Sequence, residues 1–179
     1  MEFLAPFHPQ ITHVPIVLIP LAFLFELAGR ALDRDWWRKA ALAILVAGVI
    51  GAWLSVQSGH GAEETADKQG VPQEAIDEHE EMATLMLWLS LAALAARAVA
   101  ARTGRGAPDP ASPGARAWST VVIGLGLALH LAASITVAVA AHRGGLLVFE
   151  HGAHVRLHGR LIQEGPPRGS GNEAEEHRP

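Results

Sequence analysis

Residues 40–58 read AALAILVAGVIGAWLSVQS and contain no charged side chain. A helix needs about 20 apolar residues to cross the hydrocarbon core of a bilayer. Segments 11–32, 82–101 and 117–142 are also strongly apolar, and they lack the polar stripe that a helix of a soluble protein shows at a 3.6-residue period. The sequence therefore predicts an all-α integral membrane protein, an antiparallel four-helix bundle within residues 1–162.

The composition restricts the function. Half of the 179 residues are hydrophobic, and the formal net charge is −4. Because a nucleic-acid-binding protein needs a basic face, we expect no nucleic-acid partner. The chain has no cysteine, which excludes disulfides, iron–sulfur clusters and thiolate metal sites. We find no catalytic motif and name no catalytic residue.

The basic residues predict the orientation. They gather around the first and third connectors between the predicted helices, at Arg30, Arg34, Arg38, Lys39, Arg97, Arg102, Arg105 and Arg116. Basic connectors stay in the cytoplasm. We therefore expect both termini and the acidic 61–81 loop on the periplasmic side of the inner membrane, with residues 163–179 forming a disordered periplasmic tail. The second half of that loop, Pro72–Glu81, can form a short helix that leads into the third span.

Two charged side chains lie within the predicted spans. Glu26 is one helical turn before Arg30, so the two are expected to form an ion pair. Arg97 is close enough to the end of its helix for the guanidinium to reach the membrane interface.

Most histidines lie at the predicted periplasmic ends of the helices or just beyond them, at His8, His13, His60, His79, His142, His151, His154 and His158. In an antiparallel bundle these ends converge, and two imidazoles from facing helices can ligate a haem iron. The candidate haem b ligands are His13, His60, His79, His142 and His151. Three or four imidazoles can instead hold Cu or Zn. In a third interpretation no cofactor is bound, and the imidazoles hydrogen-bond to headgroups or backbone.

His130 is the exception, because it lies midway along segment 117–142. An ionisable residue at that depth is a functional candidate, either as a ligand of a more deeply set haem or as a step in proton transfer. Alternatively, it is a neutral imidazole bonded to another helix, with Ser134 and Thr136 nearby. Gly124 and Gly126 in the same segment predict close helix packing.

Two motifs near the ends of the chain resemble a known family. Residues 8–16, HPQITHVPI, resemble the H-P-x-x-x-H-x-P-I start of the four-helix membrane family called domain of unknown function 2231. Residues 144–152, GGLLVFEHG, are similar to its G-G-x-L-V-Y-x-H-G close, with Phe149 in place of the usual Tyr. Residues 59–64 and the run His79-Glu80-Glu81 resemble one branch of the family.

The resemblance extends from residue 7 to about residue 155 and implies a four-helix protein of the bacterial inner membrane. It marks four histidines as motif positions, and these are the candidate ligands for Cu or Zn: His8, His13, His79 and His151.

These observations predict a b-type haem subunit that transfers electrons in a larger respiratory or photosynthetic complex, with its haem near the periplasmic side. Glu80 or Glu150 can orient a ligand imidazole by a hydrogen bond. Two other functions stay open. One is a cofactor-free accessory or scaffold subunit of a membrane complex. The other is a periplasm-facing metal-handling or transport protein, whose acidic 61–81 loop attracts cations. The expected partners are other membrane subunits of a redox complex and the lipid bilayer.

Overall fold

The computed structural model describes residues 2–106, 113–153, 155–157 and 160–161. Its elements are a 3-10 helix η1 (Glu2–Phe7), the helices α1 (His8–Ile11), α2 (His13–Ala31), α3 (Asp35–Lys68), α4 (Gln73–Gly106) and α5 (Pro113–Phe149), and the paired antiparallel strands β1 (Arg156–Leu157) and β2 (Arg160–Leu161). The predicted tail at 163–179 lies outside the described residues.

Four helices are long and apolar enough to cross a membrane, within Phe3–Ala31, Asp35–Lys68, Gln73–Arg102 and Ala117–Phe149. Large apolar side chains point outward along all of them, including Leu24, Ile50, Trp88, Leu125 and Ile135. A lipid environment solvates such surfaces, whereas a monomer in water rarely exposes so many. The prediction of an all-helical membrane protein with four spans is confirmed.

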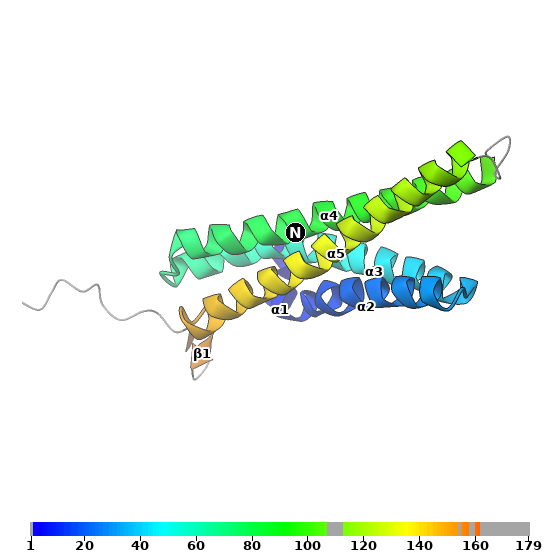
Figure 1. Cartoon of the computed structure of the whole chain (residues 1–179). Helices are drawn as coiled ribbons and strands as arrows, with labels where there is room; N and C mark the ends of the chain where they lie inside the picture. Colours follow the sequence, from blue (N-terminus) through cyan, green and yellow to red (C-terminus); the bar gives the residue numbers. More distant parts are fainter. Residues whose placement is uncertain (1, 107–112, 154, 158–159, 162–179) are drawn as a thin grey trace, which may run out of the picture.

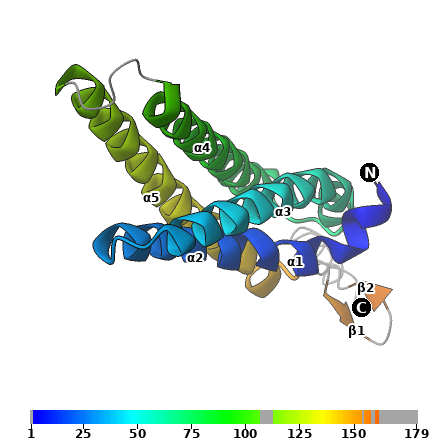
Figure 2. The same cartoon turned by 90° about the vertical axis from the view of Figure 1, so that its right-hand side faces the viewer.

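The long helices form two pairs, α2 with α3 and α4 with α5. The basic end is where α2 passes into α3 and α4 ends; it carries Arg30, Arg34, Arg38, Lys39, Arg97 and Arg102. The acidic end is where α3 passes into α4 and α5 ends; it carries Glu63, Glu64, Asp67, Glu74, Asp77, Glu78, Glu80 and Glu81. These ends lie at opposite sides of the molecule (Figure 1). The two pairs diverge toward the basic end (Figure 2).

All four long helices contribute to one apolar core, which contains Ile19, Ala22, Leu45, Val49, Ala52, Met86, Leu87, Ala133 and Val137. The helices α2 and α3 approach closely at Gly51, where an added Cβ would overlap the side chain of Val14, and at Gly29, where it would lie 2.7 Å from the Arg38 Cγ. The predicted packing role of Gly124 is wrong, because an added Cβ there meets nothing within 4 Å. At Gly126 it would lie 3.4 Å from the Ala96 Cβ. The tighter glycine contacts are therefore those between α2 and α3, whereas Gly126 makes an ordinary van der Waals contact with α4.

The predicted 61–81 loop is wrong in its first half, because α3 continues to Lys68, whereas the helix expected over its second half is present as the start of α4 at Gln73. Only four residues connect them. Gly70, with φ of +83°, ends α3 in a Schellman motif. Its N–H donates to the Asp67 carbonyl at 2.9 Å, and the Val71 N–H donates to the Ala66 carbonyl at 3.2 Å. Most of the acidic side chains therefore project from helices.

Candidate functional site

The imidazole of His8, the first residue of α1, is held by α3. Its Nδ1 lies 2.9 Å from the Ser58 Oγ, and that hydroxyl donates to the Ser55 carbonyl at 2.9 Å. Because the hydroxyl proton is used in that bond, Ser58 accepts from the Nδ1–H of His8. In the neutral imidazole this leaves the lone pair on Nε2. Ser58 is fully buried, so this anchor is fixed by the packing of α3.

The imidazole of His79 on α4 is held in the same way by α5. Its Nδ1 donates to the Ala140 carbonyl at 3.0 Å, so the neutral ring also carries its lone pair on Nε2. Gly144 makes room for this ring, because a Cβ added there would lie 2.9 Å from the His79 Cε1. Gly144, the first glycine of the C-terminal motif, is therefore needed for the packing of His79 against α5.

The structure brings these two rings together, with centroids 6.4 Å apart and planes at 87°. The rings come from different helices, α1 and α4, and each has its Nδ1–H occupied by a protein acceptor. Metal-ligating histidines commonly use one nitrogen in this way, which fixes the tautomer and the ring orientation. A centroid separation of 6.4 Å at a steep angle is within the range of edge-to-face ring packing. Both rings carry the lone pair on Nε2, so this nitrogen of His8 and of His79 is the one that would hold a metal or a haem iron.

The other candidate histidines are arranged differently. His13 is exposed, and its Nδ1 donates to the Pro9 carbonyl of its own helical turn at 2.6 Å. The exposed His60 lies 2.8 Å from the Glu80 Oε1. His142 is exposed and His151 is half-buried. Within the described residues, no ring contact joins these four to another histidine. His154 and His158 lie outside the residues whose side chains are described.

The candidate Cu or Zn set is not gathered into one cluster. Over the described part of the chain, no group of three or more His, Asp or Glu side chains is placed to hold a metal ion. His8 and His79 are neighbours, whereas His13 faces outward. Glu150, a candidate for orienting an imidazole, is exposed, and Glu80 contacts His60.

His130 is buried among α2, α4 and α5 at 1% exposure. Its Nε2 donates to the Ile19 carbonyl of α2 at 3.0 Å, and its ring meets that of Phe23 edge-on at 5.4 Å. Ser134 and Thr136 donate to carbonyls of α5 itself, at His130 and Ala132. The geometry is that of the alternative interpretation, a neutral imidazole bonded across to another helix.

The sequence interpretation missed a buried ion cluster near the basic end. The carboxylate of Glu26 lies 2.5 Å from Arg30, as predicted, and 2.6 Å from the Nη2 of Arg97. Arg97 turns inward between the helices to reach this carboxylate. Its side chain is 16% exposed and also donates to the Arg38 carbonyl at 3.0 Å. Opposite charges within two apolar segments were the available signal, because ionisable groups inside a membrane pair with one another.

The four apolar helices and the polar groups held between them define an all-helical integral membrane protein. The chain belongs to the family described as "Predicted membrane protein (DUF2231)", whose model matches residues 4–157. No curated protein and no solved structure matches the chain.

Proposed function

We propose that this protein is a membrane subunit that binds one b-type haem between His8 and His79 and transfers electrons within a larger respiratory or photosynthetic complex. The observation that carries this proposal is the pairing of two imidazoles from separate helices at 6.4 Å, each with its Nδ1–H already bonded. When bound, the haem supplies a one-electron couple at its iron.

The residues around the pair would suit a haem-ligating role for His8 and His79. Ser58 and the Ala140 carbonyl hold the ligand tautomers, and Gly59 and Gly144 keep the space beside the rings clear. At Gly59 an added Cβ would lie 3.3 Å from the His8 Cε1. Such second contacts raise the basicity of a ligand imidazole and keep it in place.

The proposed orientation puts the acidic end and both termini in the periplasm and the basic end in the cytoplasm of a bacterial inner membrane. It rests on the concentration of Lys and Arg near the basic end. The haem would then lie toward the periplasmic side, where a partner redox subunit can reach it.

The alternative is a cofactor-free accessory subunit. The observation that favours it is that both Nδ1 bonds cross between helices, from α1 to α3 and from α4 to α5. Bonds of this kind stabilise helix contacts in a membrane without any cofactor. In that case the two imidazoles serve packing alone.

Visible absorbance separates the two functions. The full chain is purified in detergent from a host supplied with haem, and spectra are recorded after oxidation and after reduction with dithionite. We expect a sharp α-band in the reduced protein, which His8→Ala and His79→Ala each remove. The exposed His60 and His142 provide controls, because His60→Ala and His142→Ala should retain the band. A featureless spectrum of the unaltered protein would overturn the haem proposal and leave the accessory subunit.

A further inference from the structure

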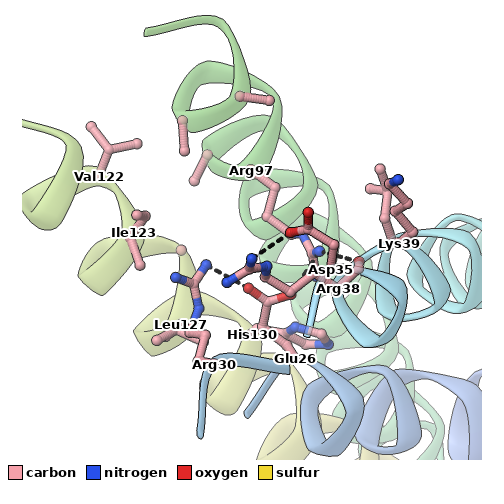
Figure 3. Close-up of a pocket in the computed structure, with 15 residues that line it drawn as sticks. Glu26, Arg30, Asp35, Arg38, Lys39, Arg97, Val122, Ile123, Leu127 and His130 are labelled. Carbon is pink, nitrogen blue, oxygen red and sulfur yellow. Dashed lines mark hydrogen bonds and ion pairs between the residues drawn. The ribbon is translucent and has the colours of Figure 1, made fainter. Parts of the chain in front are cut away.

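A cavity of about 860 Å³ lies at the basic end, where the two helix pairs diverge (Figure 3). All four long helices line it. The cluster of Glu26, Arg30 and Arg97 lies at its wall, beside His130. The proposed haem site uses none of these residues.

The charges of this cavity do not balance. Its basic lining residues are Arg30, Arg38, Lys39 and Arg97, and its acidic ones are Glu26 and Asp35. Four cations against two carboxylates leave two positive charges in excess. Glu26 is shared by Arg30 and Arg97, and Asp35 is bonded to Arg38. The carboxylates are therefore already used by guanidinium groups.

The hydrogen-bond donors are also in excess. In the described part of the chain, the buried Nε of Arg30 and Nη1 of Arg97 have no hydrogen-bond partner, and neither has the Oε2 of Glu26, which is only in ion-pair contact with the Nη2 of Arg97 at 2.6 Å. A guanidinium has five N–H donors and no acceptor, and a buried donor without a partner costs free energy. An additional anionic acceptor in the cavity would correct both the charge and the donor excess.

The opposite wall is apolar. Val122, Ile123 and Leu127 of α5 lie across the cavity from Arg38 and Lys39 of α3 (Figure 3). A ligand that satisfies both walls has an anionic head and a hydrocarbon tail. The cavity also lies toward one end of the apolar spans, because Arg30, Asp35 and Ala101 line it.

We propose that this cavity binds an anionic phospholipid, with its phosphate against Arg30, Arg38 and Lys39 and an acyl chain along Val122, Ile123 and Leu127. Basic pockets between helices near a membrane surface recognise anionic headgroups. The site is independent of any haem at the acidic end.

Lipid binding is measured by native mass spectrometry of the full chain in detergent, titrated with dioleoylphosphatidylglycerol or with zwitterionic dioleoylphosphatidylcholine. We expect phosphatidylglycerol to bind more tightly than phosphatidylcholine. The double variant Arg38→Gln/Lys39→Gln should weaken phosphatidylglycerol binding about thirtyfold, since each basic side chain in contact with the phosphate contributes a factor of about five to six in affinity. The matched control Arg34→Gln/Arg102→Gln removes the same charge from exposed residues of the same end that do not line the cavity. It should bind nearly as the unaltered protein does.

A second variant keeps every charge and fills the apolar wall. Ile123→Trp should weaken phosphatidylglycerol binding, because the larger side chain takes the place of the acyl chain. It should change the weak binding of a free anion little, because an anion without a tail does not contact this wall. Inorganic phosphate is therefore titrated in parallel, and we expect no comparable binding. The proposal is overturned if both lipids bind equally, if both double variants lose the same affinity, or if inorganic phosphate binds as tightly as the lipid.

Discussion

The carboxylate of Glu26 on α2 lies 2.6 Å from the guanidinium of Arg97 on α4. This ion pair joins the two helix pairs near the basic end, where they diverge. Glu26 is 2% exposed, and a buried charge is strongly destabilising when its partner is removed. The pair therefore ties α4 to α2 near the basic end.

Replacing Glu26→Gln should lower the free energy of unfolding by about 3 kcal/mol, because two guanidinium groups lose their shared acceptor. Unfolding of the detergent-solubilised protein by SDS, followed by circular dichroism, measures the loss. The control is Glu64→Gln, since the Glu64–Lys68 pair is exposed on both sides and should contribute little. Adding Arg97→Leu to Glu26→Gln should restore part of the loss. If the losses of unfolding free energy in the two single variants add up in the double variant, Glu26 and Arg97 do not interact.

Two glycines provide a matched test of helix packing. Gly51→Ala introduces a methyl group into the side chain of Val14 and should destabilise the protein by about 2 kcal/mol, a common cost of overpacking. Gly124→Ala meets nothing within 4 Å and should be neutral or slightly stabilising, because alanine is the better helix former. Thermal unfolding of both variants in the same detergent measures the difference. Equal stability of the two would contradict the close approach of α2 and α3.

The buried His130 should be structural. His130→Ala removes the bond to the Ile19 carbonyl and the contact with Phe23, and it leaves a cavity, so we expect a loss of about 2 kcal/mol. The visible spectrum should not change. His142→Ala on the exposed face of α5 is the control for stability. A lost or shifted α-band in His130→Ala would make this histidine a haem ligand or neighbour after all.

The helical spans followed from the sequence because a bilayer requires long apolar segments, and composition alone reveals them. The extension of α3 to Lys68 did not, since residues such as Glu63 and Glu64 are equally suited to a loop or to a helix in water. Gly70 followed by Val71 and Pro72 was the stop signal that marked the short turn. The His8–His79 pairing depends on how α1 and α4 are rotated, which residue spacing within each segment does not determine. For the same reason the sequence did not predict that Arg97 turns inward to Glu26.

The last prediction concerns the two adjacent glycines of the C-terminal motif, and it rests on the proposed haem site. A Cβ at Gly144 would lie 2.9 Å from the Cε1 and 3.3 Å from the Nδ1 of His79. Gly144→Ala should therefore displace this imidazole from the Ala140 carbonyl and lower the haem content of the purified protein severalfold. The neighbouring Gly145 has open space, with nothing within 4 Å of an added Cβ, so Gly145→Ala should keep both the haem and the α-band.

Haem content per protein, measured from the reduced absorbance band, compares the two glycine variants, and circular dichroism confirms that both are folded. Haem binding should fall in Gly144→Ala without loss of helix, because the added methyl group displaces the His79 imidazole and does not disturb the apolar core. If Gly144→Ala retains full haem while His79→Ala loses it, the His79 imidazole can bind haem from a shifted position. The hydrogen bond to the Ala140 carbonyl is then not needed to orient that imidazole. If neither substitution affects the haem, His79 is not its ligand.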